Sequence, residues 1–172
     1  MKDKANVEYR FTMRNKINVR FHEVDAYKIV HNVHYFNYFD IGRFALVDRL
    51  FRKEDAKDEC PYLFLVLRSD CKFVYPAQMA DNLVVESTIC YQTAQQNARL
   101  GITHFIFKKA GSVKIAEGSS VLGICNQKYQ LLYRFPVEVR EYLHSQICHY
   151  TENPIPDLKI KRSKAVGSPN MR

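Results

Sequence analysis

The feature that most constrains the fold of this chain is a change in hydrophobic period near residue 31. From Asn32 to Leu50 apolar side chains recur at helical spacing, whereas the segments on both sides alternate as strands do. The apolar residues cover much more than the stripe of about 100° that a surface helix shows, which predicts a helix covered on most sides. Asn32 is the expected N-cap, and the charged run 52–59 is the expected stop signal.

Strand-like segments make up most of the remaining sequence. They are rich in β-branched and aromatic residues, and short turn-like stretches separate them. The expected strands are residues 17–24, 62–67, 69–75, 83–93, 99–108 and 112–126, and a short helix is expected after Pro136. Because the turns are short, neighbouring strands should pair antiparallel. The pattern predicts an α+β fold with one long central helix wrapped by an antiparallel β-sheet.

The chain has 172 residues, the length of one domain, and its charge is unevenly distributed. We expect an N-terminal lead-in at residues 1–14, a folded domain at 15–153 and a mobile basic tail at 154–172. The net charge is +8, and residues 157–172 hold five basic residues against one acidic residue. Half of the excess charge therefore lies in the expected tail, and the chain lacks the aromatic strand motif or dense arginine stripe of nucleic-acid-binding domains.

The cysteines and the termini indicate the cellular compartment. Five cysteines are present, an odd number without a CxxC pair and without zinc-like spacing to the histidines. This predicts reduced thiols and no metal site. The first residues, MKDKANVEYRF, lack the apolar core of a secretory signal, and no uncharged apolar run approaches the roughly 18 residues of a membrane helix. We expect a cytoplasmic protein without a membrane partner.

Two segments resemble a known family. The first, VRFHEVDAYKIVHNVHYFNYFDIGR at residues 19–43, is similar to the signature of the hot-dog-fold acyl-CoA thioesterases, and more narrowly of the 4-hydroxybenzoyl-CoA thioesterase and YbgC-like branch. The second, CKFVYPAQMADNLVV at 71–85, is similar to this family's aromatic strand, Pro-Ala corner and following apolar strand. Lys28 and Ala80 stand where the family has glycine. Because glycine reaches positive φ cheaply and lysine does not, Lys28 bears directly on the geometry of its turn.

The resemblance implies a hot-dog fold and hydrolysis of an acyl-CoA to a free acid and coenzyme A, with no cofactor beyond the CoA of the substrate. Thioester hydrolysis needs a carboxylate or other base near the carbonyl carbon, and hydrogen-bond donors for the oxyanion. The resemblance implies Asp25 as the carboxylate, acting as nucleophile or general base, and the backbone N–H of Asn32 as the oxyanion donor. A helix start suits this second role, because free N–H groups and the positive end of the dipole meet there.

Other residues near Asp25 have a functional and an ordinary structural interpretation. His31 can orient a water or bind the thioester, or it can be a structural histidine beside a turn. Tyr35 can line an acyl pocket, or it can belong to the core face of the helix. Lys28 can bind a CoA phosphate, or it can be a solvated turn residue. Glu23 is the carboxylate close enough in sequence to substitute for Asp25.

Alternative functions stay open at the level of sequence. An acyl-carrier-protein thioesterase would use the same chemistry, and a basic surface would suit an acidic carrier. A hot-dog dehydratase would need a His with Gly five residues on, a spacing that neither His31 nor His104 has. A non-catalytic module that binds nucleic acid or another polyanion would use the basic tail. The resemblance also implies a homodimer or homotetramer with acyl-CoA as substrate, and we expect no nucleic-acid partner.

Overall fold

The computed structural model describes residues 7–51, 62–93, 95–108, 113–152 and 158–164. Its elements are β1 (Val7–Asn18), the 3₁₀ helix η1 (Phe21–Glu23), α1 (Asn32–Phe51), β2 (Tyr62–Phe73), β3 (Asn82–Gln92), β4 (Arg99–Lys108), β5 (Val113–Asn126), α2 (Val137–Glu152) and β6 (Leu158–Lys164). The expected stop signal at 52–59 lies outside the described residues.

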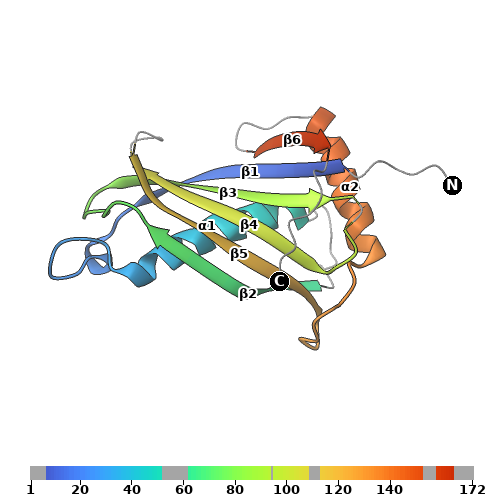
Figure 1. Ribbon diagram of the computed structural model, residues 1–172, viewed down its shortest axis with the longest axis horizontal. Coiled ribbons are helices and arrows are strands. Elements are labelled where there is room, and N and C mark those ends of the chain that lie inside the picture. Colours follow the sequence, from blue (N-terminus) through green and yellow to red (C-terminus); the bar gives the residue numbers. More distant parts are fainter. Residues whose placement is uncertain (1–6, 52–61, 94, 109–112, 153–157, 165–172) are drawn as a thin grey trace.

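The six strands form one antiparallel sheet in the order β2-β5-β4-β3-β1-β6. Helix α1 lies across one face of this sheet and packs on β1 and β3, and α2 lies at the end of the sheet where β1 begins (Figure 1). The prediction of an α+β fold with antiparallel pairing is confirmed. β2 and β6 are the two edge strands, so each presents an unpaired backbone edge within the described part of the chain.

Alternating side chains hold helix and sheet together. In β3 every second residue is buried against α1, and the residues between them face the opposite side of the sheet. The buried residues of α1 form one stripe, namely Tyr35, Tyr38, Phe39, Gly42, Arg43, Leu46, Leu50 and Phe51. On the other side of the helix Val33, Ile41 and Phe44 are 51%, 45% and 66% exposed. Only one face of α1 is therefore buried. The wide apolar surface of this helix had predicted that most of its sides would be buried.

The core consists of two clusters of buried residues. One lies under the second half of α1 and reaches α2, and it includes Phe11, Leu46, Leu50, Ile102, Leu122 and Leu143. The other lies under the first half of α1, and it includes Val30, Tyr35, Tyr38, Phe39, Val85 and Ile106. This second cluster fixes the start of α1 and the segment before it, which is where the candidate site lies.

Three sequence-based boundaries need correction. β1 begins at Val7 rather than at the expected residue 17, because Tyr9 and Phe11 are buried and every residue from Glu8 to Asn18 pairs with β3. The expected strand at 17–24 is wrong beyond Asn18, where the chain turns into η1. The expected strands 62–67 and 69–75 are one strand, β2, whose register shifts between Val66 and Arg68. A bulge allows one strand to continue past such an irregularity.

The expected mobile tail also needs correction. Within residues 154–172, β6 pairs antiparallel with β1, from Val7 opposite Lys164 to Met13 opposite Leu158. The pairing satisfies backbone groups of β1 that would otherwise form a sheet edge. Residues 165–172 lie outside the described residues.

His104 of β4 is a fully buried histidine under α1. Its ring stacks on Phe39 with a centroid distance of 4.7 Å. Its Nδ1 lies 2.8 Å from Ser87 Oγ, and its Nε2 lies 3.2 Å from Ser120 Oγ. Burial lowers the pKa of His104 to about 4, and the positive charge of Arg43 acts in the same direction. The neutral ring, which can donate at one nitrogen and accept at the other, satisfies this environment.

We expect His104 to make the fold sensitive to acid. The unfolded chain takes up a proton at this residue below its ordinary pKa of about 6.5, whereas the folded chain does so near pH 4, so stability is lost as pH falls through this window. The loss should total about 3 kcal/mol. Urea unfolding of the native chain and of His104→Gln between pH 7 and pH 4 measures it. The gap in unfolding free energy between the two proteins should narrow by about that amount, and a constant gap would contradict the prediction.

Candidate active site

Asp25 begins the tight turn that joins η1 to α1. Residues Val24 and Val30 form an antiparallel bridge, and the amide of Asp25 donates to the carbonyl oxygen of Ile29 at 2.8 Å. The carboxylate oxygen Oδ1 accepts from the amides of Tyr27 and Ile29 at 2.8 and 3.3 Å. These bonds use the side chain in the way typical of Asp in turns. They also hold the carboxylate in one orientation, and among the described residues the other oxygen, Oδ2, has no hydrogen-bond donor.

Lys28 and Ala80 adopt the backbone conformation of the glycines that they replace. Their φ angles are 62° and 65°, in the left-handed region. Lys28 donates its amide to the carbonyl oxygen of Asp25 at 2.9 Å, so this strained residue closes the turn that orients the carboxylate. A left-handed residue with a side chain costs about 1–2 kcal/mol. The turn of the resembling family therefore persists here without its glycine.

Helix α1 starts immediately beside this turn. The amide of His31 donates to the carbonyl oxygen of Glu23 at 2.9 Å, and the carbonyl oxygen of His31 accepts the amide of His34 at 3.0 Å. Asn32 is the first helical residue, so the N-cap is His31 and the expected N-cap at Asn32 is wrong by one position. Among the described residues the amides of Asn32 and Val33 have no acceptor, and the first turn holds no acidic side chain. The positive end of the helix is therefore available to a ligand oxygen.

Glu23 connects the turn to the helix, a role that the sequence did not reveal. Its side chain is 8% exposed, and its Oε2 accepts from the Tyr38 hydroxyl and from the Arg20 amide, each at 2.8 Å. Burial raises the pKa of Tyr38 strongly, and the adjacent Glu23 carboxylate raises it further, so the phenol keeps its proton and remains a donor. Glu23 thus fixes the chain between β1 and α1 and is not itself part of the cavity wall.

Tyr35 connects the start of α1 to the residues on the opposite side of the site. Its hydroxyl accepts from the amide of Ala77 at 3.2 Å, and the carbonyl oxygen of Ala77 accepts from the amide of Val30 at 2.8 Å. The ring of Tyr35 meets Phe73 edge-on at a centroid distance of 5.1 Å. Burial raises the pKa of Tyr35. The Pro76-Ala77 corner, part of the second segment that resembles the family, is thereby joined to the start of α1.

A surface cavity of about 580 Å³ opens between these walls. Its lining residues are Asp25, Ile29, Val30, His31, Asn32, Tyr35, Phe73, Val74, Tyr75 and Pro76. Four of the five residues predicted for the site, all except Lys28, line this one cavity. Lys28 is exposed outside it, so its contact with substrate stays a prediction. Phe73, Val74 and Tyr75 are half-exposed and give the cavity an apolar wall.

Two absences hold for the described part of the chain. No group of three or more His, Cys, Asp and Glu side chains there could hold a metal ion. None of the helices described is long and apolar enough to cross a membrane.

The fold and the cavity together define a class. A helix packed across one face of an antiparallel sheet is the fold that this chain shares with solved thioesterases. The family follows from the sequence: residues 19–143 match the Thioesterase-like superfamily, and the chain belongs to it. The narrower 4-hydroxybenzoyl-CoA and YbgC-like branch stays a prediction.

Individual relatives are distant. The chain is 26% identical over 135 residues to the chloroplastic acyl-acyl carrier protein thioesterase ATL3 of Arabidopsis thaliana, which covers 78% of this chain and 67% of that protein. The YbaW probable thioesterase from Escherichia coli is 22% identical with a TM-score of 0.60, covering 76% of this chain and 96% of that chain. The gentisyl-coenzyme A thioesterase BH1999 is 20% identical with a TM-score of 0.61, covering 74% and 98%.

Proposed function

We propose that this chain hydrolyses an acyl-CoA to the free carboxylic acid and coenzyme A. The observation that carries the proposal is that the Asp25 carboxylate and the start of α1 at Asn32 line the same cavity. An anionic group for the carbonyl carbon and free N–H donors for the carbonyl oxygen are the two requirements of thioester hydrolysis. Membership of the thioesterase-like superfamily supports the same reaction class.

Asp25 has two routes to the same products. As nucleophile, its free oxygen attacks the thioester carbon and expels the CoA thiolate, and water then hydrolyses the mixed anhydride. As general base, it takes a proton from water, whose oxygen attacks the carbon before the thiolate leaves. In both routes negative charge develops on the carbonyl oxygen, where the amide of Asn32 would stabilise it. The bonds from Tyr27 and Ile29 to Oδ1 leave Oδ2 for either role.

The remaining candidates have supporting roles in this proposal. His31 borders the cavity with an exposed side chain and would orient the water or the thioester. Tyr35 would shape the acyl end of the cavity through its ring, while its hydroxyl stays bonded to Ala77. Lys28, exposed on the turn, would meet a phosphate of CoA outside the cavity. No group other than the substrate's own CoA is needed for these steps.

We further propose that the working form is a homodimer or a homotetramer. The edge strand β2 exposes Leu63, Val66 and Leu67, and the cavity wall continues from it at Phe73. A second copy paired along this edge would bury apolar surface and enclose the open cavity. The exposed side of α1 offers another apolar surface for assembly.

The described thiols are free, which supports a reducing compartment such as the cytoplasm.

A second candidate is hydrolysis of an acyl group carried on an acyl carrier protein. The Arabidopsis relative is an acyl-acyl carrier protein thioesterase by name, which favours this candidate, and so does the basic character of this chain. The reaction at the thioester would be the same. A non-catalytic polyanion-binding module has weaker support, because it leaves the arrangement around Asp25 without a use.

Release of free thiol from short, long and aromatic acyl-CoA substrates tests the proposed function. We expect turnover of at least one of them by the purified chain, at a rate of the order of 1–10³ per second for the preferred acyl group. The same acyl group on a carrier protein separates the two candidates by their values of kcat/KM. No thiol release from any CoA or carrier substrate would refute the proposed reaction.

A further inference from the structure

Large apolar side chains are exposed at the end of the molecule that holds the candidate site. Phe21 is 81% exposed and Tyr27 is 85% exposed. Both belong to the segment between β1 and α1, which projects past the ends of the strands at the left of Figure 1. In the segment between β2 and β3, three more apolar side chains are about half exposed. We call the following set the apolar tip: Phe21, Tyr27, Val74, Tyr75 and Met79.

The two segments of the apolar tip are joined to each other and to the cavity. Ile29 and Gln78 form an antiparallel bridge between the segments. Val74 and Tyr75 are also lining residues of the cavity that holds Asp25. The apolar tip is therefore one surface, and it borders the cavity.

The charge exposed beside the apolar tip is positive. Arg20 and Lys28 are exposed, and neither forms an ion pair within the described part of the chain. The two segments also contain three carboxylates, none of which is fully exposed. Glu23 is buried, Asp25 lies in the cavity, and Asp81 is held in an ion pair with a lysine at 2.7 Å. This end of the molecule would therefore attract an anionic surface.

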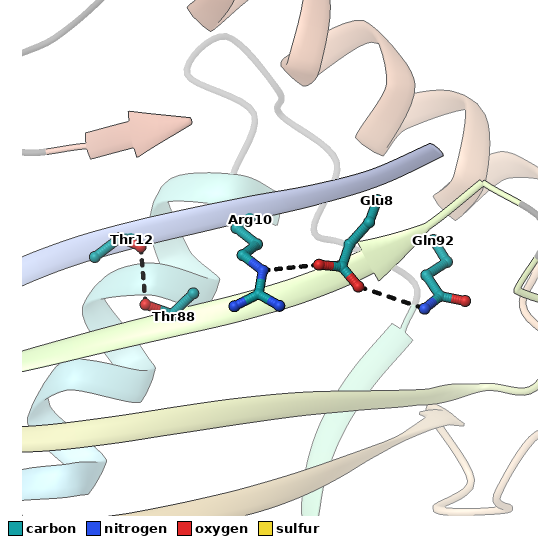
Figure 2. Close-up of polar contacts among 5 residues, drawn as sticks. All are labelled: Glu8, Arg10, Thr12, Thr88 and Gln92. Carbon is teal, nitrogen blue, oxygen red and sulfur yellow. Dashed lines mark hydrogen bonds and ion pairs between the residues drawn. The ribbon is translucent and has the colours of Figure 1, made fainter. Parts of the chain in front are cut away.

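The outer side of the sheet, which faces away from α1, has a different character. Arg10 pairs there with Glu8 at 2.7 Å, so that a carboxylate of the chain neutralises part of the positive charge (Figure 2). The aromatic side chains of this side, Phe105 and Phe107, are partly buried, and the ammonium group of Lys114 lies 5.1 Å from the Phe105 ring centroid. The outer side thus offers charge without strongly exposed aromatic rings.

Exposed aromatic rings beside free cations are complementary to a membrane surface that contains anionic lipids. Phenylalanine and tyrosine rings enter the boundary between headgroups and acyl chains, while lysine and arginine bind the lipid phosphates. A nucleic acid is bound mainly through its phosphates by many cations, whereas the described part of the tip has two free lysine or arginine side chains. The excess of apolar over charged groups therefore favours a lipid surface.

We propose that the apolar tip, together with Arg20 and Lys28, docks this protein on an anionic membrane surface with the cavity next to the lipid. The contact is peripheral, and it replaces the sequence-based expectation that no membrane takes part. The docking does not depend on the proposed hydrolysis, but hydrolysis gives it a use. Because each buried CH₂ group favours the bilayer by about 0.8 kcal/mol, long acyl thioesters gather at membranes, where the docked cavity would receive them.

A single tryptophan placed in the tip tests the contact directly, because the chain contains no tryptophan of its own. On vesicles of equal parts phosphatidylcholine and phosphatidylglycerol, the emission of Tyr27→Trp should shift to the blue and should be quenched by brominated lipid. Tyr133→Trp is the matched control, at a residue 92% exposed in the connection between β5 and α2. β5 runs antiparallel to β1, so this connection lies at the opposite end of the sheet. No shift at Tyr27→Trp, or the same shift at both positions, would overturn the proposal.

Sedimentation with the same vesicles measures the affinity. Phe21→Ser with Tyr27→Ser should weaken binding about tenfold or more, and the matched pair Tyr129→Ser with Tyr133→Ser should change it less than about twofold. Lys28→Glu should also weaken binding, as should added salt, whereas Lys128→Glu should not. Equal effects of the tip variants and their controls would contradict docking through the tip.

Hydrolysis of a short, water-soluble acyl-CoA without vesicles separates the docking from the proposed function. Phe21→Ser with Tyr27→Ser should keep kcat within about twofold, because neither side chain lines the cavity. Hydrolysis without vesicle binding would refute docking and leave the proposed function intact, and vesicle binding without hydrolysis of any thioester would refute hydrolysis alone. Loss of a dimer in this double variant, with vesicle binding unchanged, would assign the tip to a second copy of the chain and overturn the proposal.

Discussion

Replacing Asp25 by Asn is expected to lower kcat for thioester hydrolysis by about a thousandfold or more, with little change in KM. The amide oxygen of Asn can still accept the bonds from Tyr27 and Ile29, so the turn should keep its shape. What disappears is the negative charge on the second oxygen. A positioned general base contributes about 10²–10⁴ in rate, and loss of a nucleophile costs at least as much. Steady-state release of thiol from the preferred acyl-CoA measures the effect.

Asp81 provides a matched control for this experiment. It also sits in a tight turn, where its Oδ2 accepts from the amide of Gln78 at 2.9 Å, and it lies outside the cavity lining. Asp81→Asn keeps that acceptor and loses only a partly buried ion pair with Lys108. We expect its kcat to remain within about threefold of the native value, since Asp81 does not line the cavity. If Asp25→Asn retained a tenth of the native kcat, Asp25 would be a turn residue and not the catalytic carboxylate.

Much of the fold could be predicted from hydrophobic periodicity. The helix from Asn32 and the strands β3, β4 and β5 lie within one residue of their expected bounds, because each has a regular pattern and a clear turn signal. The prediction failed where tertiary contacts override local pattern. In residues 19–24 the sequence alternates like a strand, yet Glu23 turns inward to the Tyr38 hydroxyl and the chain forms η1.

The strand β6 carries a sequence signal of its own. Its sequence begins Leu158, Lys159, Ile160, Lys161, which alternates as a strand does. The high charge of this segment and the nearby prolines favour a tail and so mask the alternation. Edge strands are commonly short and rich in lysine, because such residues discourage further pairing. Charge in a terminal segment is therefore weak evidence against a strand.

The candidate site was predictable only where its residues are close in sequence. Asp25, His31, Asn32 and Tyr35 belong to one motif and meet across a single turn. The apolar wall from Phe73 to Pro76 is about forty residues away, and its contact depends on the bridge between Ile29 and Gln78. No local pattern encodes that bridge. The contacts of Glu23 with Tyr38 and Arg20 were likewise not predictable. A glutamate that will be buried cannot be told from an exposed glutamate by the local sequence.

The second large effect is expected at Gly118 of β5. This residue lies opposite His104 on β4 and opposite Cys71 on β2, and the ring of Phe39 from α1 fills the space above it. A Cβ atom added here would overlap the carbonyl oxygen of Asp70 and would lie 2.7 Å from Phe39 Cε2. The first contact is with backbone, so a change of side-chain rotamer cannot relieve it. Strand β2, which carries Asp70, would have to shift, and the Phe39 ring of α1 would have to move aside.

Gly118→Ala should therefore lower the free energy of unfolding by about 3 kcal/mol or more, and Tm by about 10 °C. Gly101 of β4 is the matched control, because a Cβ atom there would meet nothing within 4 Å. Alanine is favoured over glycine in an open strand position by about 0.5–1 kcal/mol, so Gly101→Ala should leave stability equal or slightly higher. Thermal and urea unfolding of the two single variants gives the comparison. Equal stability of the two variants would show that β2 and the Phe39 ring do not pack closely on Gly118.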